Sequence, residues 1–257
     1  MRSLPNLKVV LASSALKALE PALRTSHDVI SAWTDQAPAV YADAQVLVTA
    51  DDIPLERDLL TMMPKLRLVA CATREYDAID VDALTGDGID VVGAEHVNDE
   101  DVADHALGAI LMHWRAILAG SRLLAAGRWS GDGRLVNRSM IGARLGIVGL
   151  GQIGTALACR ASALRMDVGW WAPRKKPTPW PRKSDLLALA QWSDVLAVTA
   201  RPDGNDDMIG HAALDALGEH GFLVNVSRGR LVDEDAPIAS LKEGRLEGAA
   251  LDVFSRN

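Results

Sequence analysis

Short apolar runs alternate with helix-like segments along the whole chain, and this alternation limits the possible folds more than any other feature. Most runs are rich in Val, Ile or Leu and are not interrupted by polar residues, as expected of parallel strands covered on both faces. The segments between them have helical apolar spacing, which the crossovers of a parallel sheet require. The predicted strands are residues 7–11, 46–49, 66–70, 89–92, 145–149, 167–171, 195–199, 222–226 and 249–253. The pattern predicts an α/β fold.

The alternation is interrupted once, after the strand predicted at 89–92. Residues 98–101 read Asn-Asp-Glu-Asp, and such side chains can cap the free N–H groups of a helix N-terminus and suit its dipole. The apolar positions from 103 to 126 then predict one long helix, which a glycine-rich loop follows. A long helix between two strand-rich halves predicts two α/β domains joined by a helical connector.

Charge and cysteine content exclude several classes of function. The chain has 27 Lys and Arg against 34 Asp and Glu, so its formal charge is −7, which disfavours sequence-independent binding of nucleic acid. The two cysteines, Cys71 and Cys159, cannot form a disulfide framework, and no Cys/His group has metal-ligand spacing, so we expect no metal. No apolar stretch approaches the roughly 20 residues of a membrane span, and the N-terminal apolar run fits a buried strand better than a leader. We expect a cytoplasmic protein.

The strongest local pattern is the G-x-G-x-x-G spacing of Gly149, Gly151 and Gly154, completed by Gln152 and Ile153. A predicted strand precedes it and a predicted helix follows. In this context Gly149 permits a tight turn, Gly151 lets a pyrophosphate approach the backbone, and Gly154 lets helix and strand pack closely. The anion would then lie at the helix N-terminus. The pattern predicts a dinucleotide-binding turn, and the alternative is a glycine-rich turn without a ligand.

The end of the next predicted strand bears on the choice of nicotinamide coenzyme. An acidic residue there would bind the ribose 2′-hydroxyl and repel a 2′-phosphate, but that position holds Ala172. Arg174 and Lys175 follow, and both can bind a phosphate. NADP(H) is therefore favoured, while NAD(H) stays possible. The alternative is a solvated basic loop, because Arg182 and Lys183 extend the cluster.

Three further segments, together with the glycine motif, carry a family resemblance: residues 98–107, 223–234 and 248–254. In order and spacing they resemble the D-isomer-specific 2-hydroxyacid dehydrogenases, most clearly from about residue 66 onward. The resemblance implies two doubly wound parallel-sheet domains. Residues 1–98 would form a flavodoxin-like substrate domain, and residues 99–257 a Rossmann NAD(P)-binding domain that includes the connector helix at about 99–126.

The resemblance also implies an activity and a set of site residues. The protein would interconvert a small 2-oxo acid, of the glyoxylate or hydroxypyruvate kind, and its D-2-hydroxy acid by hydride transfer, with the substrate between the domains. Arg228 would bind the substrate carboxylate and polarise the carbonyl group. Asp252 would face the nicotinamide carboxamide, and Val226 would belong to the coenzyme site. His105 matches a position in the connector helix, where we interpret it as a packing residue.

Two residues of that family have no clear counterpart in this chain. In the family, a Glu lies five positions after the Asp of the third motif. Counted from Asp252, that position holds Asn257, the last residue of the sequence. The family's His, which is the general acid, would follow later. Loss of a general acid typically costs about 10²–10⁴-fold in rate, so we expect impaired turnover. The alternative is a catalytically silent, dinucleotide-binding regulatory or interaction protein.

The predicted substrate loop also departs from the family pattern. Where a glycine-rich segment usually receives the carboxylate, this chain has Arg74, Glu75 and Tyr76. Glu75 would restrict the loop and repel an anion, and Arg74 would offset that charge, unless both side chains point to solvent. A homodimer, formed through the connector helix and residues 127–137, is expected from the resemblance alone.

Overall fold

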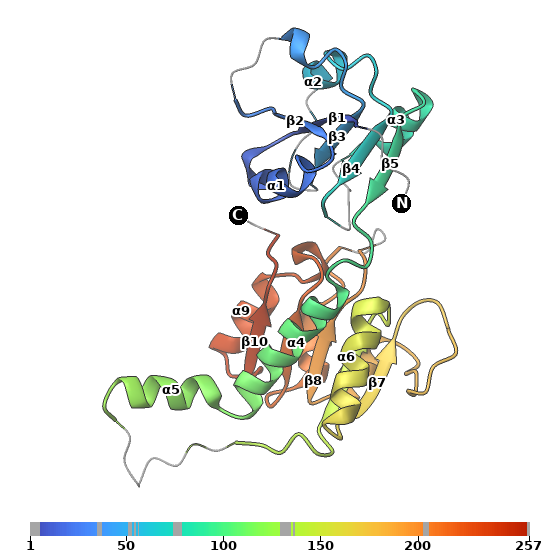
Figure 1. The fold of residues 1–257 in the computed structure, drawn as a ribbon. Coiled ribbons are helices and arrows are strands. Elements are labelled where there is room, and N and C mark those ends of the chain that lie inside the picture. The colour runs from blue at the N-terminus through green and yellow to red at the C-terminus, as the bar shows by residue number, and fades with distance from the viewer. Residues whose placement is uncertain are drawn as a thin grey trace. The chain divides into compact units, whose positions relative to one another are not determined.

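The computed structural model divides into two compact units, Met1–Val97 and Asn98–Asn257 (Figure 1). The residues that it describes are 6–34, 38–50, 53, 55, 57–73, 79–128, 135, 137–202 and 206–255. Within these ranges, no helix combines the length and the apolar character that a bilayer crossing requires.

The first unit contains a parallel sheet whose strands lie in the order β2-β1-β3-β4-β5. The strands are β1 (Lys8–Leu11), β2 (Asp28–Ser31), β3 (Val46–Thr49), β4 (Leu68–Cys71) and β5 (Asp90–Gly93). The helices are η1 (Ser14–Leu19), α1 (Glu20–Leu23), η2 (Pro38–Val40), α2 (Arg57–Thr61) and α3 (Val81–Gly86). Each sheet face has its own apolar cluster, one around Val10 and Leu47 and the other around Val9 and Val48. This strand order is that of flavodoxin-like folds, as expected.

Strand β2 is absent from the strands predicted from the sequence. Only two of its residues, Val29 and Ile30, are apolar, and Asp28 and Ser31 flank them. It pairs with β1 alone at the edge of the sheet, and Asp28 is exposed. Three of its four residues are buried, but one of them is Ser31, so the apolar run is only two residues long and the pattern that reveals the other strands does not reveal this one.

The second unit contains a parallel sheet in the order β10-β9-β8-β6-β7. Its strands are β6 (Arg144–Val148), β7 (Asp167–Trp171), β8 (Val195–Val198), β9 (Phe222–Asn225) and β10 (Gly248–Leu251). Its helices are α4 (Asp99–Trp114), α5 (Ile117–Ala125), α6 (Gln152–Ala163), α7 (Leu186–Trp192), α8 (His211–Leu217), η3 (Gly229–Leu231) and α9 (Asp235–Lys242).

Helices cover both faces of this sheet (Figure 1). The cluster on one face contains residues of α4 and α6 such as Ile110 and Leu157, and the cluster on the other contains Leu189 of α7 and Leu214 of α8. Burial on both faces explains why the strands read as continuous apolar runs. Because the strands are parallel, the loops after β6, β8, β9 and β10 leave the sheet at the same edge, where open α/β sheets bind ligands.

The connector is two helices, which corrects the prediction of one long helix. Helix α4 ends at Trp114, whose indole N–H donates to the carbonyl oxygen of Ser139 at 3.0 Å. Ala116 then adopts a left-handed conformation, with φ 53° and ψ 29°, before α5 begins. The apolar spacing continues through this turn, so it gives no sign of the break. Helix α5 buries none of its described side chains, and Leu124 is 65% exposed.

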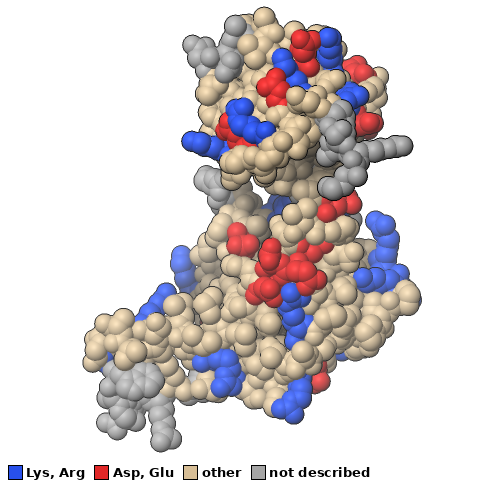
Figure 2. All heavy atoms as spheres, viewed as in Figure 1, with Lys and Arg blue, Asp and Glu red and all other residues tan. Residues whose placement is uncertain are grey.

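Acidic side chains gather where α4 begins, as predicted for a helix N-terminus (Figure 2). Asn98 is the N-cap residue, but within the described chain its side chain makes no capping hydrogen bond. Arg160 of α6 pairs with Glu100 at 2.7 Å and with Asp104 at 2.6 Å. These ion pairs join α4 to α6.

Candidate functional site

The glycine-rich turn joins β6 to α6, and two of its glycines, Gly149 and Gly154, meet a steric demand there. Gly149 has a φ of +88°, and a Cβ added to it would lie 2.5 Å from the Cα of Ala200. A Cβ on Gly154 would lie 2.7 Å from Oγ1 of Thr199 and would overlap the carbonyl oxygen of Gly149. That oxygen also accepts a hydrogen bond of 2.5 Å from the Thr199 hydroxyl. The turn is therefore held tightly against the loop after β8.

Gly151 differs from the other two glycines, because no heavy atom lies within 4 Å of the position that a Cβ would take. It is the N-cap of α6, and in the described residues no side chain caps this end and no acid occupies the first turn. Gln152 is exposed, and Ile153 packs against the core. An open backbone with N-terminal N–H groups suits an anion, so these residues fit the pyrophosphate of a dinucleotide.

Arg228 follows β9 in a loop that hydrogen bonds hold in shape. The buried Asn225 side chain donates to the Arg228 carbonyl oxygen at 2.9 Å and accepts from the Ser227 N–H at 3.1 Å. The Ser227 hydroxyl donates to the carbonyl oxygen of Ala200 at 2.8 Å. Arg228 is half-buried, and its Nη1 donates to the Ser227 carbonyl oxygen at 2.8 Å. Ala200 also packs against Gly149. The arginine loop and the glycine-rich turn therefore both contact Ala200, in the loop after β8 of the same unit.

The segment after β10 closes over the same loop. Asp252 donates its backbone N–H to the Asn225 carbonyl oxygen at 2.9 Å. A Cβ on the buried Gly229 would overlap the backbone of Phe254 and Ser255. Ser255 N–H donates to Oε1 of Glu234 at 2.5 Å. Sequence reasoning did not identify these roles of Gly229 and Glu234, although both belong to the motif that contains Arg228.

His105 contacts Asp252 and is not packed into the core, which corrects its interpretation as a packing residue. Its Nε2 lies 3.5 Å from Oδ1 of Asp252, and the two side chains are 56% and 44% exposed. Val226, in contrast, is buried in the core cluster that it shares with α4, so only its backbone faces the loops.

The basic loop after β7 is more structured than a solvated turn. Arg182 donates to the carbonyl oxygen of Ala172 at 2.7 Å. Lys183 Nζ lies 3.8 Å from the ring centroid of Trp192. These two cations therefore contact protein groups, while Arg174 and Lys175 are exposed. The solvated-loop alternative does not describe Arg182 and Lys183.

Four of the predicted site residues, Arg74, Glu75, Tyr76 and Asn257, lie outside the described residues. Strand β4 leads toward the first three and ends at Cys71, whose Sγ lies 3.0 Å from Oγ1 of Thr73. Among the His, Cys, Asp and Glu residues that the structure does describe, no group of three or more is arranged to hold a metal ion.

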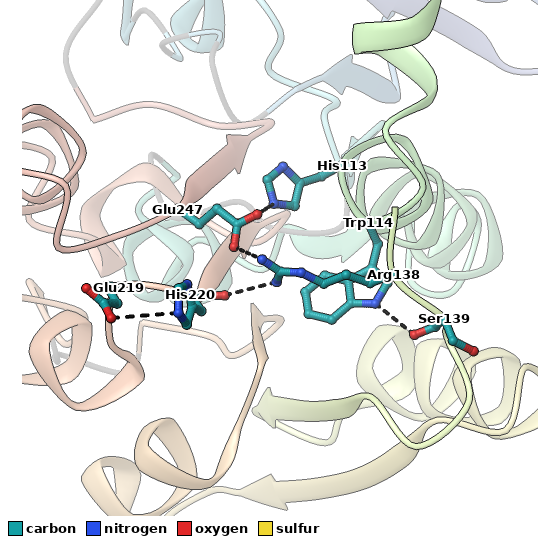
Figure 3. Close-up of polar contacts among 7 residues, drawn as sticks. All are labelled: His113, Trp114, Arg138, Ser139, Glu219, His220 and Glu247. Carbon is teal, nitrogen blue, oxygen red and sulfur yellow. Dashed lines mark hydrogen bonds and ion pairs between the residues drawn. The ribbon is translucent and has the colours of Figure 1, made fainter. Parts of the chain in front are cut away.

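A second polar cluster lies at the amino ends of β9 and β10, away from these loops (Figure 3). His113 stacks on Phe222 with a centroid distance of 4.0 Å, and its Nε2 lies 3.4 Å from Oε1 of Glu247. Arg138 pairs with Glu247 and lies over the ring of Trp114. Burial lowers the pKa of His113; Glu247 opposes this shift, and Arg138 adds to it. The cluster anchors the end of α4.

Comparison with known proteins adds independent findings. Residues 107–257 match the family described as "D-isomer specific 2-hydroxyacid dehydrogenase, NAD binding domain". A 2-ketogluconate reductase from Gluconobacter oxydans (strain 621H) is 34% identical over 221 residues, which span 85% of this chain and 70% of the relative. A 2-hydroxyacid dehydrogenase structure from Ketogulonicigenium vulgare Y25 has a TM-score of 0.89 at 28% identity and covers 99% of this chain and 83% of that one. The NADPH-dependent glyoxylate/hydroxypyruvate reductase of Sinorhizobium meliloti, solved with NADP and malonate, has a TM-score of 0.84 at 27% identity, covering 98% and 81%.

Proposed function

Since this chain belongs to the D-isomer-specific 2-hydroxyacid dehydrogenases, a family of NAD(P)-dependent oxidoreductases, we propose that it reduces a small 2-oxo acid to the D-2-hydroxy acid with NADPH. The observation that carries this proposal is the hydrogen bond from Ser227 to Ala200, which joins the loop of Arg228 to the glycine-rich turn. A cation suited to a carboxylate is thereby fixed in the same assembly as a turn suited to a pyrophosphate.

Within this proposal, residues 99–257 bind the coenzyme and residues 1–98 contribute to substrate binding. When bound, the coenzyme would supply a hydride to the carbonyl carbon of the substrate, and solvent water would supply the proton to the carbonyl oxygen. Arg228 binds the substrate carboxylate through its guanidinium group and stabilises the negative charge that develops on the carbonyl oxygen. Asn225 and Ser227 orient the arginine backbone, and Asp252 faces the nicotinamide carboxamide.

The preference for NADPH rests on the residues after β7. Ala172 stands where an acid would repel a 2′-phosphate, and the exposed Arg174 and Lys175 supply positive charge beyond it. The Sinorhizobium meliloti reductase, named for its NADPH dependence, supports the same preference. Its printed activity also supports glyoxylate or hydroxypyruvate as the substrate class for this chain.

We also propose a homodimer that uses α5. This helix buries none of its described side chains, and Ile117, Leu118 and Leu124 are among its exposed apolar residues. Monomeric surfaces rarely present several large apolar side chains on one short helix, so a second copy of the chain is the expected cover.

The decisive experiment measures NADPH oxidation with glyoxylate, hydroxypyruvate and larger 2-oxo acids in the 257-residue chain and in Arg228→Ala. Loss of a charge that stabilises the transition state should lower kcat/KM by about 10²–10³-fold. The Kd for NADPH should change little. Arg230→Ala is the matched control, because Arg230 is an exposed arginine two residues along the same loop.

Full turnover in Arg228→Ala would contradict the assigned role of this arginine. If the unmodified chain bound NADPH but reduced none of the acids, the result would support the alternative, a dinucleotide-binding regulatory or interaction protein. The expectation that the 257-residue chain turns over its substrate slowly stays a prediction. The same assay tests it by comparing the turnover rate of this chain with that of a fully active relative.

A further inference from the structure

The first unit contains a pocket of about 490 Å³ between its edge strand, β2, and the helical turns η1 and α1. Its volume lies within the range of sites that bind small molecules in proteins. The glycine-rich turn and the arginine loop belong to the second unit, so they form no part of it. Six of the described residues that line the pocket are used below: Lys17, Glu20, Arg24, Val29, Ser31 and Trp33.

The side chain of Ser31 points toward this pocket from the end of β2. Val29 and Ser31 are two positions apart in the strand, so their side chains lie on the same face of the sheet. Val29 packs in a cluster with Leu16 of η1, which identifies this face as the one that η1 covers. Ser31 is 7% exposed, and its hydroxyl has no hydrogen-bond partner in the described part of the chain. A buried hydroxyl without a partner costs free energy, and a bound ligand would supply the missing partner.

The helical side of the pocket carries two cations and one carboxylate. Arg24 donates from Nε and Nη2 to the same oxygen of Glu20, at 2.9 and 2.7 Å. Lys17 is exposed, and none of the ion pairs among the described residues includes its ammonium group. Two positive charges and one negative charge give these side chains a net charge of +1 at neutral pH. Because Glu20 and Arg24 neutralise each other, the charge of Lys17 is the one open to a ligand.

The side of the pocket that follows β2 also offers apolar surface. Trp33 packs against the same cluster as Val29 and is only partly buried, so part of its indole ring stays open. An indole ring presents a large flat surface on which another flat group can stack. The pocket therefore combines one open positive charge, one buried hydroxyl and one aromatic surface.

We propose that this pocket binds a small organic monoanion, a carboxylate attached to a flat apolar body. The carboxylate accepts hydrogen bonds from the Lys17 ammonium group and the Ser31 hydroxyl, and the apolar body stacks on Trp33. A serine side chain moves readily between staggered rotamers, so Ser31 can turn its hydroxyl toward the ligand. Glu20 disfavours a dianion such as phosphate, because its charge repels the second negative charge. The site lies in the first unit and does not depend on the proposed function.

Calorimetry with benzoate and benzamide tests the charge, since the two compounds have the same shape and only benzoate is an anion. The complete chain carries Arg228→Ala as a background substitution, so that the arginine loop does not bind benzoate as well. Benzoate should bind about tenfold more tightly than benzamide, as expected of a charge-assisted hydrogen bond, and inorganic phosphate should bind more weakly than benzoate. Lys17→Ala should abolish the difference between benzoate and benzamide. Lys65→Ala is the control, because Lys65 is an exposed lysine of the same unit that pairs with Asp43, and it should change neither Kd.

Ser31→Ala separates binding from stability. The variant removes a hydroxyl that has no partner among the described residues, so the midpoint of urea unfolding should not decrease. The Kd for benzoate should increase about fivefold to tenfold, because the carboxylate loses one donor. Ser240→Ala is the control, since it removes another buried hydroxyl without a described partner, and it should leave the Kd unchanged. A lower midpoint with an unchanged Kd in Ser31→Ala would give the hydroxyl a structural role and overturn the proposal.

Trp33→Leu tests the apolar surface. It should weaken benzoate about threefold, the usual effect of losing an aromatic contact, and leave the Kd for acetate, which has no ring, unchanged. Trp33→Phe keeps a ring at this position and should retain most of the affinity, so it keeps this arm informative if Trp33→Leu fails to fold. Equal weakening of benzoate and acetate in both variants would contradict stacking on Trp33.

Four other results would overturn the proposal. Benzoate and benzamide could bind equally, or phosphate could bind more tightly than benzoate; either result would exclude recognition of a monoanion. The Kd for benzoate could be the same with and without Lys17→Ala, which would exclude the assigned cation. Finally, binding of benzoate in the unmodified chain but not in the Arg228→Ala background would assign this ligand to the arginine loop.

Discussion

The hydroxyl of Ser227 donates a hydrogen bond of 2.8 Å to the carbonyl oxygen of Ala200. Through this bond the loop after β9 is attached to the loop after β8. Ala200 is also the residue against which Gly149 packs. The position of Arg228, the next residue along the chain, therefore depends on the same contacts that shape the glycine-rich turn.

Ser227→Ala tests this dependence. Loss of one hydrogen bond should lower the free energy of unfolding by about 1 kcal/mol, as measured by urea denaturation. If the arginine is displaced, kcat/KM should fall about tenfold while the Kd for NADPH stays constant, because positioning errors act on the reacting groups. Ser240→Ala is the control, since the Oγ of this buried serine has no hydrogen-bond partner in the described part of the chain. Equal losses of activity in the two variants would contradict the role of Ser227.

Gly149→Ala should lower the free energy of unfolding for two separable reasons. Its φ of +88° is unfavourable for alanine, and the new Cβ would collide with Ala200. Gly244→Ala is the matched control, because Gly244 has a φ of +69° but no heavy atom within 4 Å of the Cβ position. We expect a loss of about 1 kcal/mol of unfolding free energy in the control. In Gly149→Ala we expect about 2 kcal/mol more, with weaker NADPH binding. Similar losses in both would show that the close approach to Ala200 is unimportant.

The glycine-rich turn could be identified from the sequence because its constraints are local, whereas the arginine motif was identified only by its resemblance to the family. A positive φ at Gly149 and a close approach at Gly154 are demands on single residues within one short segment. The central strands could be predicted for a similar reason, since burial on both faces selects apolar residues at consecutive positions.

Contacts between distant residues could not be predicted in this way. The bond from Ser227 to Ala200 spans 27 positions, and the bond from Trp180 to Ser162 spans 18. Neither leaves a periodic signal, because serine and tryptophan occur in many environments. The turn at Ala116 was also undetectable, since the apolar spacing is the same in α4 and α5 although α5 buries none of its described residues.

Stability should fall in mild acid because of His113. Burial lowers the pKa of this side chain in the folded protein, so between the lowered pKa and the ordinary value of 6.5 the unfolded chain binds more protons. The free energy of unfolding should therefore decrease as pH falls below about 6.5 and level off once the folded form is also protonated. Urea denaturation between pH 7.5 and 5 measures this slope.

The variant His113→Gln should flatten that slope while lowering stability at pH 7.5, because the stacking on Phe222 is lost. His220→Gln is the control, since this side chain is 82% exposed and Arg138 contacts only its backbone carbonyl oxygen. An unchanged slope in His113→Gln would mean that another group causes the acid sensitivity. Asp194 adds to the loss at lower pH: burial raises its pKa, but hydrogen bonds from Arg144 outweigh burial and lower it overall.

The exposed apolar side chains of α5 predict a dimer that charge should disrupt. Leu118 and Leu124 are 45% and 65% exposed, and in the described residues α5 buries no side chain, so replacing both with glutamate should not affect the fold of the monomer. Sedimentation should show a dimer for the unmodified chain and a folded monomer for the double variant. Leu187→Glu is the control, because Leu187 is a leucine of similar exposure, 48%, on α7. A double variant that remains dimeric would place the interface elsewhere, whereas loss of the dimer in Leu187→Glu would show that added charge acts nonspecifically.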